Sequence, residues 1–230
     1  MANKRPSIWK HWAEVFLRLC LLLFQISLFL IILYRIVPVP VTPLMLLRGL
    51  PYEKDWVAFE KMSPTIVKAA ITAEDPKFSK HHGFDFEAIW ESINKSIAKG
   101  RKAKGRSTIS QQTAKNLFFS PTRSWIRKGL EVPLTLSLEI FWTKRRIIEV
   151  YLNIIEMGDK VYGIEAASKK YFKKPSAKLS KAEAAAIVVC FPNPRKRNPL
   201  KLNSRLKRKQ ATIQRWMNGY EAAPDWWWEE

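Results

Sequence analysis

The first long pattern in the chain is an uncharged apolar run over residues 19–34, bounded by Arg18 and Arg35. This run is short for a membrane span, which takes about 20 residues. The two arginines can extend their charged ends toward the headgroups and so lengthen the usable span. We therefore predict one transmembrane helix over residues 18–37.

The basic residues around this anchor predict its orientation. Lys4, Arg5, Lys10 and Arg18 precede the apolar run, and the positive-inside rule places such a segment, residues 1–17, in the cytoplasm. Arg35 weakens that asymmetry, and a cleaved signal peptide is the alternative. No small-x-small cleavage site follows in residues 36–41, which favours an uncleaved signal anchor with the remainder outside the cytoplasm.

Three prolines follow the anchor. Pro38, Pro40 and Pro43 predict a stiff, extended stalk over residues 38–54. From about residue 55 the pattern is almost wholly helical, without a useful length of strand-like alternation and without a repeat.

The first helix of this region has a clear start and end. Ser63 and Pro64 are typical of an N-cap and a first helical position. Pro76 should end the helix near Asp75, because the residue before a proline avoids the helical conformation. The apolar stripe between these ends consists of Ile66, Val67, Ala70 and Ile71.

Later helices are predicted from caps and spacing. Asp85 should cap a helix, and Thr108 with Gln111 has the spacing of a capping box for the next one. In the helix after Asp85, the positions spaced for burial are Phe86, Ile89, Trp90, Ile93 and Ile97.

The second half continues in the same way. Ser120 and Pro121 should open a helix that continues through Glu131, with a kink at Pro133. The remaining helices are predicted over residues 144–157, 163–172 and 180–190, the last of them opened by a capping box of Ser180 and Glu183.

Composition narrows the class of partner. The chain has 40 Lys and Arg against 20 Asp and Glu, a net charge of +20 at pH 7. Such a charge implies a polyanionic partner, either nucleic acid or an anionic membrane surface with phosphorylated lipids. Cys20 lies in the apolar run and Cys190 in a late helix, so we expect no intramolecular disulfide.

Glu74 is the first candidate for chemistry. It follows Ile71 and Ala70 by three and four residues, so on a helix it shares their apolar face. It also lies in the last turn, where the helix dipole disfavours negative charge. These surroundings suit a general base that works near neutrality. A solvated glutamate at a helix end is the alternative.

A basic, glycine-containing loop over residues 99–106 precedes the helix that starts at Ser107 or Thr108. The free backbone N–H groups at the start of a helix bind anions. The hydroxyl and amide side chains there can donate further hydrogen bonds, and Lys115 and Arg123 would add positive charge. The segment is therefore a candidate phosphate cradle. The Gly-x4-Gly-Lys-Ser/Thr pattern of a P-loop is absent, and an ordinary capped helix is the alternative.

Three further features are ambiguous. Arg127 and Glu131 are four residues apart and could form part of a site or a surface ion pair. His81 and His82 could suggest a metal, but adjacent histidines rarely ligate one ion, and no Cys/His array supports zinc. The basic run at residues 195–209 is either a solvated face or an attraction for anionic lipid, at ~1 kcal/mol per charge.

Five motifs occur in order along the chain. They are Glu74-Asp75-x-x-Phe78-x-x-His81-x-Gly83-Phe84-Asp85, Gly105-x-Ser107-Thr108-Ile109-x-Gln111-Gln112-x-x-Lys115-Asn116, Arg127-Lys128-x-x-Glu131, Lys144-x-x-Ile147-x-Glu149-x-Tyr151-Leu152-Asn153, and Tyr162-Gly163-Ile164-Glu165-Ala166-Ala167 continuing to Tyr171-Phe172. Together they resemble the motifs of the bacterial peptidoglycan glycosyltransferases. The similarity covers roughly residues 50–200.

The resemblance implies an all-α, lysozyme-like glycosyltransferase domain over residues 55–200. A basic, Trp-rich extension over residues 201–230, which includes Trp226 and Trp228, would follow it. Since 230 residues leave no room for a transpeptidase domain, we expect the monofunctional biosynthetic form. It would lie in the inner membrane as a single-pass protein, with its catalytic domain outside the cytoplasm.

Enzymes of this family polymerise lipid II, an undecaprenyl-pyrophosphate-linked disaccharide-pentapeptide. Glu74 matches the general base that deprotonates the 4-hydroxyl of the acceptor GlcNAc. The alkoxide attacks the anomeric carbon of the donor MurNAc with inversion and expels undecaprenyl pyrophosphate. Lys115 and Arg123 match residues that hold the pyrophosphate. Glu131 matches a second essential carboxylate, which is discussed with a divalent metal bound through the pyrophosphate.

The resemblance also implies further contacts and partners. The other expected substrate-binding residues are Asp75, Phe78, His81, Ser107, Thr108, Gln111, Gln112, Asn116, Arg127 and Lys128. Asn153 is expected to be structural. We expect Mg²⁺ or Mn²⁺ and no organic cofactor. Lipid II, the growing glycan chain, the bilayer and division or elongation proteins are the expected partners, with no nucleic acid.

Two other functions compete with this interpretation. A lytic transglycosylase or lysozyme-like hydrolase would share the fold and the catalytic glutamate but would need no pyrophosphate cradle, so Lys115 and Arg123 argue against it. A membrane-tethered module that binds nucleic acid or anionic lipid is supported by the charge of +20 alone, and no nucleic-acid-binding motif is present.

Overall fold

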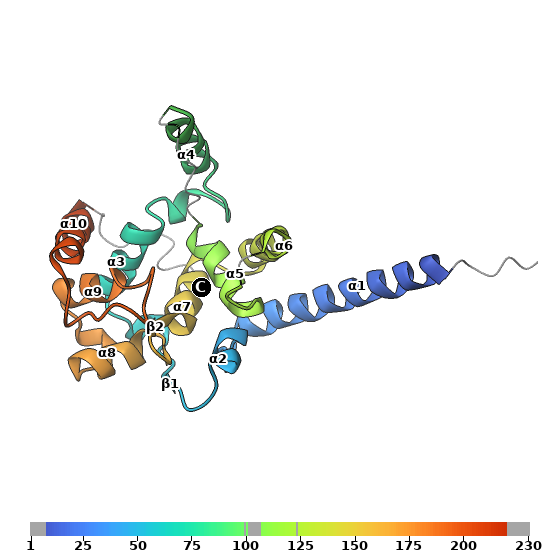
Figure 1. The fold of residues 1–230 in the computed structure, drawn as a ribbon. Helices are drawn as coiled ribbons and strands as arrows, with labels where there is room; N and C mark the ends of the chain where they lie inside the picture. Colours follow the sequence, from blue (N-terminus) through green and yellow to red (C-terminus); the bar gives the residue numbers. More distant parts are fainter. Residues whose placement is uncertain (1–7, 99, 101–106, 123, 220–230) are drawn as a thin grey trace, which may run out of the picture.

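One long helix, α1 (Ile8–Tyr34), extends from a body of shorter helices (Figure 1). The computed structural model describes residues 8–98, 100, 107–122 and 124–219. Most of the predicted basic loop, together with Arg123 and the tryptophans at 226–228, lies outside the described residues.

The body is predominantly helical, as predicted. In chain order its elements are α2 (Pro43–Arg48), β1 (Glu53–Lys54), η1 (Phe59–Lys61), α3 (Pro64–Glu74), η2 (Phe78–Lys80), α4 (Phe86–Ala98), α5 (Ile109–Phe118), α6 (Trp125–Phe141), α7 (Lys144–Ile154), β2 (Glu156–Gly158), β3 (Val161–Tyr162), α8 (Ile164–Phe172), η3 (Ser176–Lys178), α9 (Lys181–Val188) and α10 (Ser204–Gly219).

Within the described ranges, α1 is the one helix long and apolar enough to cross a membrane. Its 27 residues span about 40 Å. It begins at Ile8, before the predicted span. Its other end is attached to the body, because Trp142 Nε1 donates a hydrogen bond to the carbonyl oxygen of Ile31 at 2.7 Å, and Arg146 Nε donates to that of Tyr34 at 2.9 Å.

The predicted stalk does not stay extended. Pro43 opens α2, because a proline fits the first turn of a helix and the hydroxyl of Thr42 caps that turn. Before it, Lys54 Nζ donates to the carbonyl oxygens of Val39 and Pro40, at 2.5 Å and 3.1 Å. Val39 is buried in the core, so the segment lies against the body. The prediction of an extended stalk is wrong for residues 43–48, which form a helix.

Helix α3 follows its sequence signals closely. Ser63 caps it, Pro64 opens it and Asp75 follows its last residue. The predicted stripe is confirmed as core, since Ile66, Val67, Ala70 and Ile71 are all fully buried. Helices α9 and α10 pack against α3 on one side of the body (Figure 1).

The other side of the body is built around α5, which packs against both α6 and α7. The predicted capping box is confirmed: Thr108 and Gln111 exchange hydrogen bonds at the start of α5. Ser180 and Glu183 do the same for α9, as predicted.

Two predicted helix boundaries are wrong. Helix α6 begins at Trp125, because Ser120 pairs its hydroxyl with that of Thr122 at 2.8 Å in a turn instead of capping a helix. Pro133 lies inside α6 as predicted. Helix α7 ends at Ile154, since the chain turns there into a strand.

A small sheet was not predicted. Its strands lie in the order β1-β3-β2, with β1 parallel and β2 antiparallel to β3. Glu53 pairs with Val161, and Glu156 with Tyr162. Strands of two or three residues are too short to show a period of two in the sequence.

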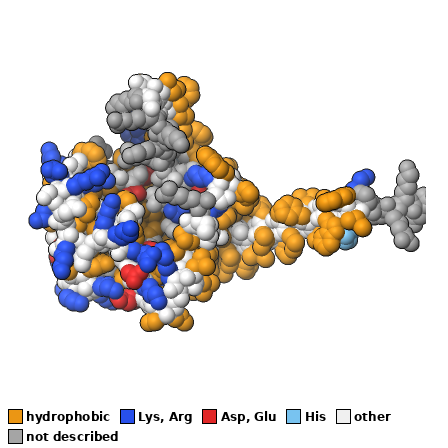
Figure 2. Space-filling model, viewed as in Figure 1, with side chains coloured by type: hydrophobic (Ala, Val, Ile, Leu, Met, Phe, Trp, Pro, Cys, Tyr) orange, Lys and Arg blue, Asp and Glu red, His pale blue; other side chains and the backbone are white. Residues whose placement is uncertain are grey.

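The predicted burial of α4 is wrong. Asp85 caps the helix as expected, accepting a hydrogen bond from the backbone N–H of Ala88 at 2.9 Å, but no described residue of α4 is buried. The exposed apolar side chains are Phe86, Ile89, Trp90, Ile93 and Ile97. Figure 2 shows hydrophobic side chains on the edge of α4 that faces the same side as α1. Periodicity indicates an apolar face but not what covers it.

Candidate active site

Glu74 is the last residue of α3 and is half-buried. Its Oε2 accepts a hydrogen bond from Gln112 Nε2 at 3.1 Å. The apolar face of α3 is buried, so the carboxylate stands where the core ends and the solvent begins. A fixed carboxylate in such a position is able to accept a proton from a bound hydroxyl.

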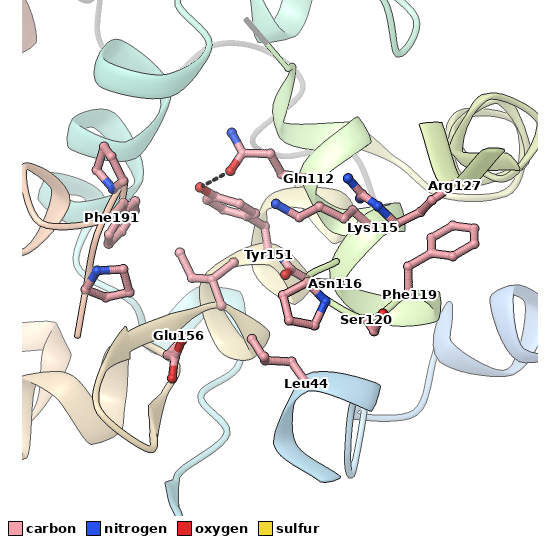
Figure 3. Close-up of a pocket in the computed structure, with 14 residues that line it drawn as sticks. Leu44, Gln112, Lys115, Asn116, Phe119, Ser120, Arg127, Tyr151, Glu156 and Phe191 are labelled. Carbon is pink, nitrogen blue, oxygen red and sulfur yellow. Dashed lines mark hydrogen bonds between the residues drawn. The ribbon is translucent and has the colours of Figure 1, made fainter. Parts of the chain in front are cut away.

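Gln112 is itself held in one orientation. The hydroxyl of Tyr151 donates to Gln112 Oε1 at 3.3 Å (Figure 3). Burial raises the pKa of Tyr151 well above its usual value, and the charges of Glu74 and Asp75 raise it further. The phenol therefore remains a donor near neutrality, and the amide hydrogens of Gln112 stay directed at Glu74.

Beside this pair lies a cavity of about 340 Å³ that we call the cation pocket. Figure 3 shows Lys115 and Arg127 extending side by side toward it, with Gln112 close to Lys115. The lining residues are Leu44, Gln112, Lys115, Asn116, Phe119, Ser120, Pro121, Arg127, Tyr151, Ile155, Glu156, Phe191, Pro192 and Pro194.

Lys115 is the cation of this pocket that lacks a partner. Its ammonium makes no hydrogen bond or ion pair with another residue that the structure describes. Loss of water around it lowers the pKa of Lys115, and the nearby charge of Glu131 partly opposes that effect. Lys115 is half-buried, and an anion bound beside its ammonium would offset the loss of water there.

Glu131 is buried and forms ion pairs with two cations of α6. It is only 2% exposed, and it pairs with Arg127 and with Lys128, whose Nζ lies 3.0 Å from Oε2. The alternative of a surface ion pair is therefore wrong. Lys128 also reaches Ser107, with Nζ 3.5 Å from Oγ, so α6 and the start of α5 meet at this carboxylate.

Other predicted substrate-binding residues lie behind the cleft. Asp75 is buried and accepts hydrogen bonds from His81 Nε2 at 3.0 Å and from the backbone N–H of Ile109 at 2.9 Å. Thr108 Oγ1 donates to the carbonyl oxygen of Gly83 at 2.7 Å. These bonds hold the end of α3 against the start of α5, so they position Glu74 relative to Gln112.

Two more of these residues are also internal. Phe78 is fully buried, with Lys144 Nζ 4.7 Å from the centre of its ring. Gln111 is buried in the capping box of α5. For the residues behind the cleft, contact with substrate stays a prediction, and the contacts that the structure shows are with the protein itself.

The structural role predicted for Asn153 is confirmed. Its Oδ1 accepts from the backbone N–H of Val57 at 2.9 Å, and its Nδ2 donates to the carbonyl oxygen of Val57 at 2.8 Å. Sequence reasoning assigned no role to Tyr151, Glu156 or Phe191, which line the cation pocket. Tyr151 lies in a quoted motif, which was the available signal, whereas Phe191 reaches the pocket only through the tertiary fold.

Comparison with known proteins gives a consistent result. A family model described as Transglycosylase matches residues 45–218. The chain is 46% identical over 199 residues to the biosynthetic peptidoglycan transglycosylase of Bdellovibrio bacteriovorus, covering 83% of this chain and 79% of that protein. It is 44% identical over 223 residues to the protein of the same name from Bacteroides thetaiotaomicron, covering 93% and 90%. For the one from Haemophilus influenzae, identity is 46% over 195 residues, covering 80% and 81%.

Proposed function

The chain belongs to the transglycosylase family, and from this premise we propose how its cleft elongates a glycan chain. It is an enzyme, a peptidoglycan glycosyltransferase, and its substrates are lipid II and the growing glycan. Its relatives are named biosynthetic transglycosylases, which favours polymerisation over the lytic alternative.

The position of Gln112 is the observation that supports the roles proposed for Glu74 and Lys115. Its amide donates to Glu74, and its side chain also lines the cation pocket that contains Lys115. A proton acceptor and a cation without a direct ion-pair partner among the described residues therefore lie on two sides of one side chain. A group-transfer reaction with an anionic leaving group needs this combination, whereas hydrolysis of a neutral glycan does not.

In the proposed reaction, Glu74 accepts the proton of the acceptor's 4-hydroxyl. The oxygen forms a bond to the anomeric carbon of the donor as the bond from that carbon to the diphosphate oxygen breaks, which inverts the configuration. The electron pair leaves with undecaprenyl pyrophosphate. A general base accelerates such a reaction by about 10²–10⁴-fold. Stabilisation of the charge on the leaving group must therefore supply much of the remaining rate enhancement.

Lys115 and Arg127 are the described residues placed to stabilise that charge. Arg127 lines the cation pocket and is held by Glu131, which fixes its guanidinium. Loss of water around the Lys115 ammonium disfavours its charged form, and an anion bound beside it would stabilise that form. We propose that these two residues hold the donor diphosphate, with Arg123 as a further predicted contact outside the described residues.

A divalent cation fits this site only together with the substrate. Glu131 already pairs with Arg127 and Lys128, and no group of three potential metal-ligating side chains is found in the residues that the structure describes. His81 Nε2 is used by Asp75. We therefore propose that Mg²⁺ or Mn²⁺ would be held mainly by diphosphate oxygens, where it would neutralise charge, with Glu131 as a distant partner.

We further propose that the enzyme sits on the outer face of the inner membrane, with α1 across the bilayer and its N-terminus in the cytoplasm. Besides α1, helix α6 exposes a row of apolar side chains: Trp125, Ile126, Leu130, Val132, Leu136 and Ile140. Exposed apolar faces on α4 and α6 support contact with the bilayer surface near a lipid-linked substrate. Association with division or elongation proteins stays a prediction.

The test is polymerisation of labelled lipid II in detergent by the purified full chain, with Mg²⁺ or with EDTA, beside Glu74→Gln. We expect a lysozyme-sensitive polymer from the wild type alone. Release of fragments from preformed glycan, without polymer, would instead support the lytic reaction. Equal turnover by Glu74→Gln would show that another group is the base.

A further inference from the structure

A second cavity is lined by Glu74 and borders the cation pocket at Pro192, which lines both. It has a volume of about 170 Å³, and we call it the α10 pocket because the C-terminal helix forms one wall. Its lining residues are Ala73, Glu74, Val188, Val189, Pro192, Lys209, Thr212, Ile213 and Trp216. Glu74 thus borders a cavity whose far wall comes from a part of the chain that the proposed mechanism does not use.

Helical spacing explains how α10 presents this wall. Leu206, Ile213 and Met217 are buried and hold α10 against α3 and α9. Lys209 and Trp216 are seven residues apart, so they lie two turns apart on nearly the same side of the helix. The helix is therefore fixed by one stripe and turns the adjacent stripe toward the catalytic carboxylate.

The two outer residues of that stripe are both exposed. Trp216 is 55% exposed, although exposure of a large aromatic side chain to water is unfavourable. Lys209 is exposed, and its ammonium makes no hydrogen bond or ion pair with any described residue, although Glu74 lines the same cavity. An aromatic wall and an unpaired cation beside a carboxylate fit a sugar ring that carries an anionic group.

The two cavities lie next to each other, so each has room for a different substrate. If the donor diphosphate occupies the cation pocket, the acceptor must bring its hydroxyl to Glu74 from space that the diphosphate leaves free. The α10 pocket is such a space, and it places a sugar-stacking surface next to the base. This argument rests on the proposed function.

We propose that Trp216 and Lys209 bind the acceptor substrate. Trp216 packs its indole against the apolar face of an acceptor sugar ring, and Lys209 pairs with an anionic group of the same acceptor. That group is a carboxylate of the peptide or the diphosphate of the acceptor lipid, since both are oxyanions that an ammonium binds. The C-terminal helix is then a positioning element for the acceptor.

The experiment separates donor from acceptor. A short glycan chain on the lipid serves as donor, lipid II serves as acceptor, and initial rates are measured in detergent with the full chain. We expect Trp216→Ala and Lys209→Gln each to raise the KM for the acceptor about tenfold, with kcat and the KM for the donor changed by less than about threefold. Trp216→Phe should restore most of the loss, because it keeps an aromatic face.

Matched controls lie on the same helix. Lys207 and Arg208 are exposed but do not line the α10 pocket, so Lys207→Gln and Arg208→Gln should leave the acceptor KM unchanged. Equal losses in these controls would mean that only the net charge matters and would overturn the proposal. If Trp216→Ala fails to fold in a thermal unfolding control, Lys209→Gln decides the matter.

A second acceptor substrate shows whether Lys209 binds the peptide carboxylate or the diphosphate. If lipid II with amidated peptide carboxylates abolishes the difference between wild type and Lys209→Gln, Lys209 binds the peptide. If the difference persists, it binds the diphosphate. An unchanged acceptor KM in both Trp216→Ala and Lys209→Gln, with polymerisation still dependent on Glu74, would overturn this inference alone. Absence of any polymer from the wild type would overturn the proposed function itself.

Discussion

Glu74 and Gln112, which are 38 positions apart in the sequence, are joined by a hydrogen bond of 3.1 Å between two helices. This bond connects the end of α3 with α5, and α5 also carries Lys115. The proton acceptor and the charge that should receive the leaving group are therefore set relative to each other through one amide. Movement of α3 against α5 would disturb both halves of the reaction together.

The first prediction concerns the base. Glu74→Gln keeps the size of the side chain and its contact with Gln112 but removes the ability to accept a proton. We expect polymerisation to fall by about 10²–10⁴-fold, with unchanged thermal unfolding and unchanged attachment to membranes. Loss of the folded state in the same assay would mean that the variant reports on stability and not on catalysis.

The second prediction concerns the amide that orients the base. Gln112→Ala removes the donor to Glu74, and a hydrogen bond to a charged group is worth about 1.5–3 kcal/mol. We expect kcat to fall about 10–100-fold. Tyr151→Phe, which removes only the 3.3 Å bond to the far side of the same amide, should cost less than about tenfold. A larger loss from Tyr151→Phe would indicate that the phenol acts on the substrate directly.

The sequence predicted those parts of the fold that depend on local chemistry. Ser63 with Pro64 and Thr108 with Gln111 mark helix starts through bonds within one turn, so a short window contains all the information. The helix start predicted at Ser120 was wrong because the hydroxyl of Ser120 bonds to that of Thr122. The sequence alone does not distinguish this bond from a helix cap.

Features that depend on distant contacts were not predictable in this way. The five apolar positions of α4 predicted a buried face, but periodicity reports a difference between two faces and not the identity of the medium that covers one of them. The burial of Glu131 depends on how α6 packs against α5. The α10 pocket depends on how residues 209–216 fold back toward Glu74.

The third prediction is a conflict between stability and activity at Lys115. Its lowered pKa means that the folded protein disfavours the charged form. Lys115→Met should therefore stabilise the substrate-free protein by about 0.5–2 kcal/mol, while polymerisation falls at least about a hundredfold because the diphosphate loses its cation. Pyrophosphate should raise the Tm of the wild type more than that of Lys115→Met.

The same residue predicts a dependence on pH. Between the lowered folded pKa of Lys115 and the usual lysine value of 10.5, the unfolded chain binds more protons than the folded one. Stability therefore rises with pH through that window. The advantage of Lys115→Met over the wild type should shrink as the pH approaches 10.5, as measured by urea unfolding at a series of pH values. A constant advantage would show that the effect is one of packing.

The fourth prediction concerns the buried carboxylate. Glu131→Gln removes the charge that Arg127 and Lys128 share, and loss of one partner from a buried ion pair costs about 3–5 kcal/mol. We expect a large fall in the urea midpoint together with loss of activity. Glu53→Gln is the matched control, since Glu53 pairs with Lys170 at an exposed position, 2.7 Å apart, and should cost less than about 1 kcal/mol.

The fifth prediction concerns the exposed apolar face of α4. Trp90 is 66% exposed, so Trp90→Gln should leave the free energy of unfolding nearly unchanged. If this face rests on the bilayer, the variant should polymerise lipid II about fivefold more slowly than the wild type in proteoliposomes, because apolar area is withdrawn from the lipid. In detergent micelles, where lipid II is not held in a plane, the two proteins should have similar rates. Lys95→Gln is the control, because Lys95 lies on the polar side of the same helix and pairs with Glu91. Equal slowing of Trp90→Gln and Lys95→Gln in proteoliposomes, or slowing of Trp90→Gln in detergent as well, would show that α4 acts on the fold or the cleft and does not contact the membrane.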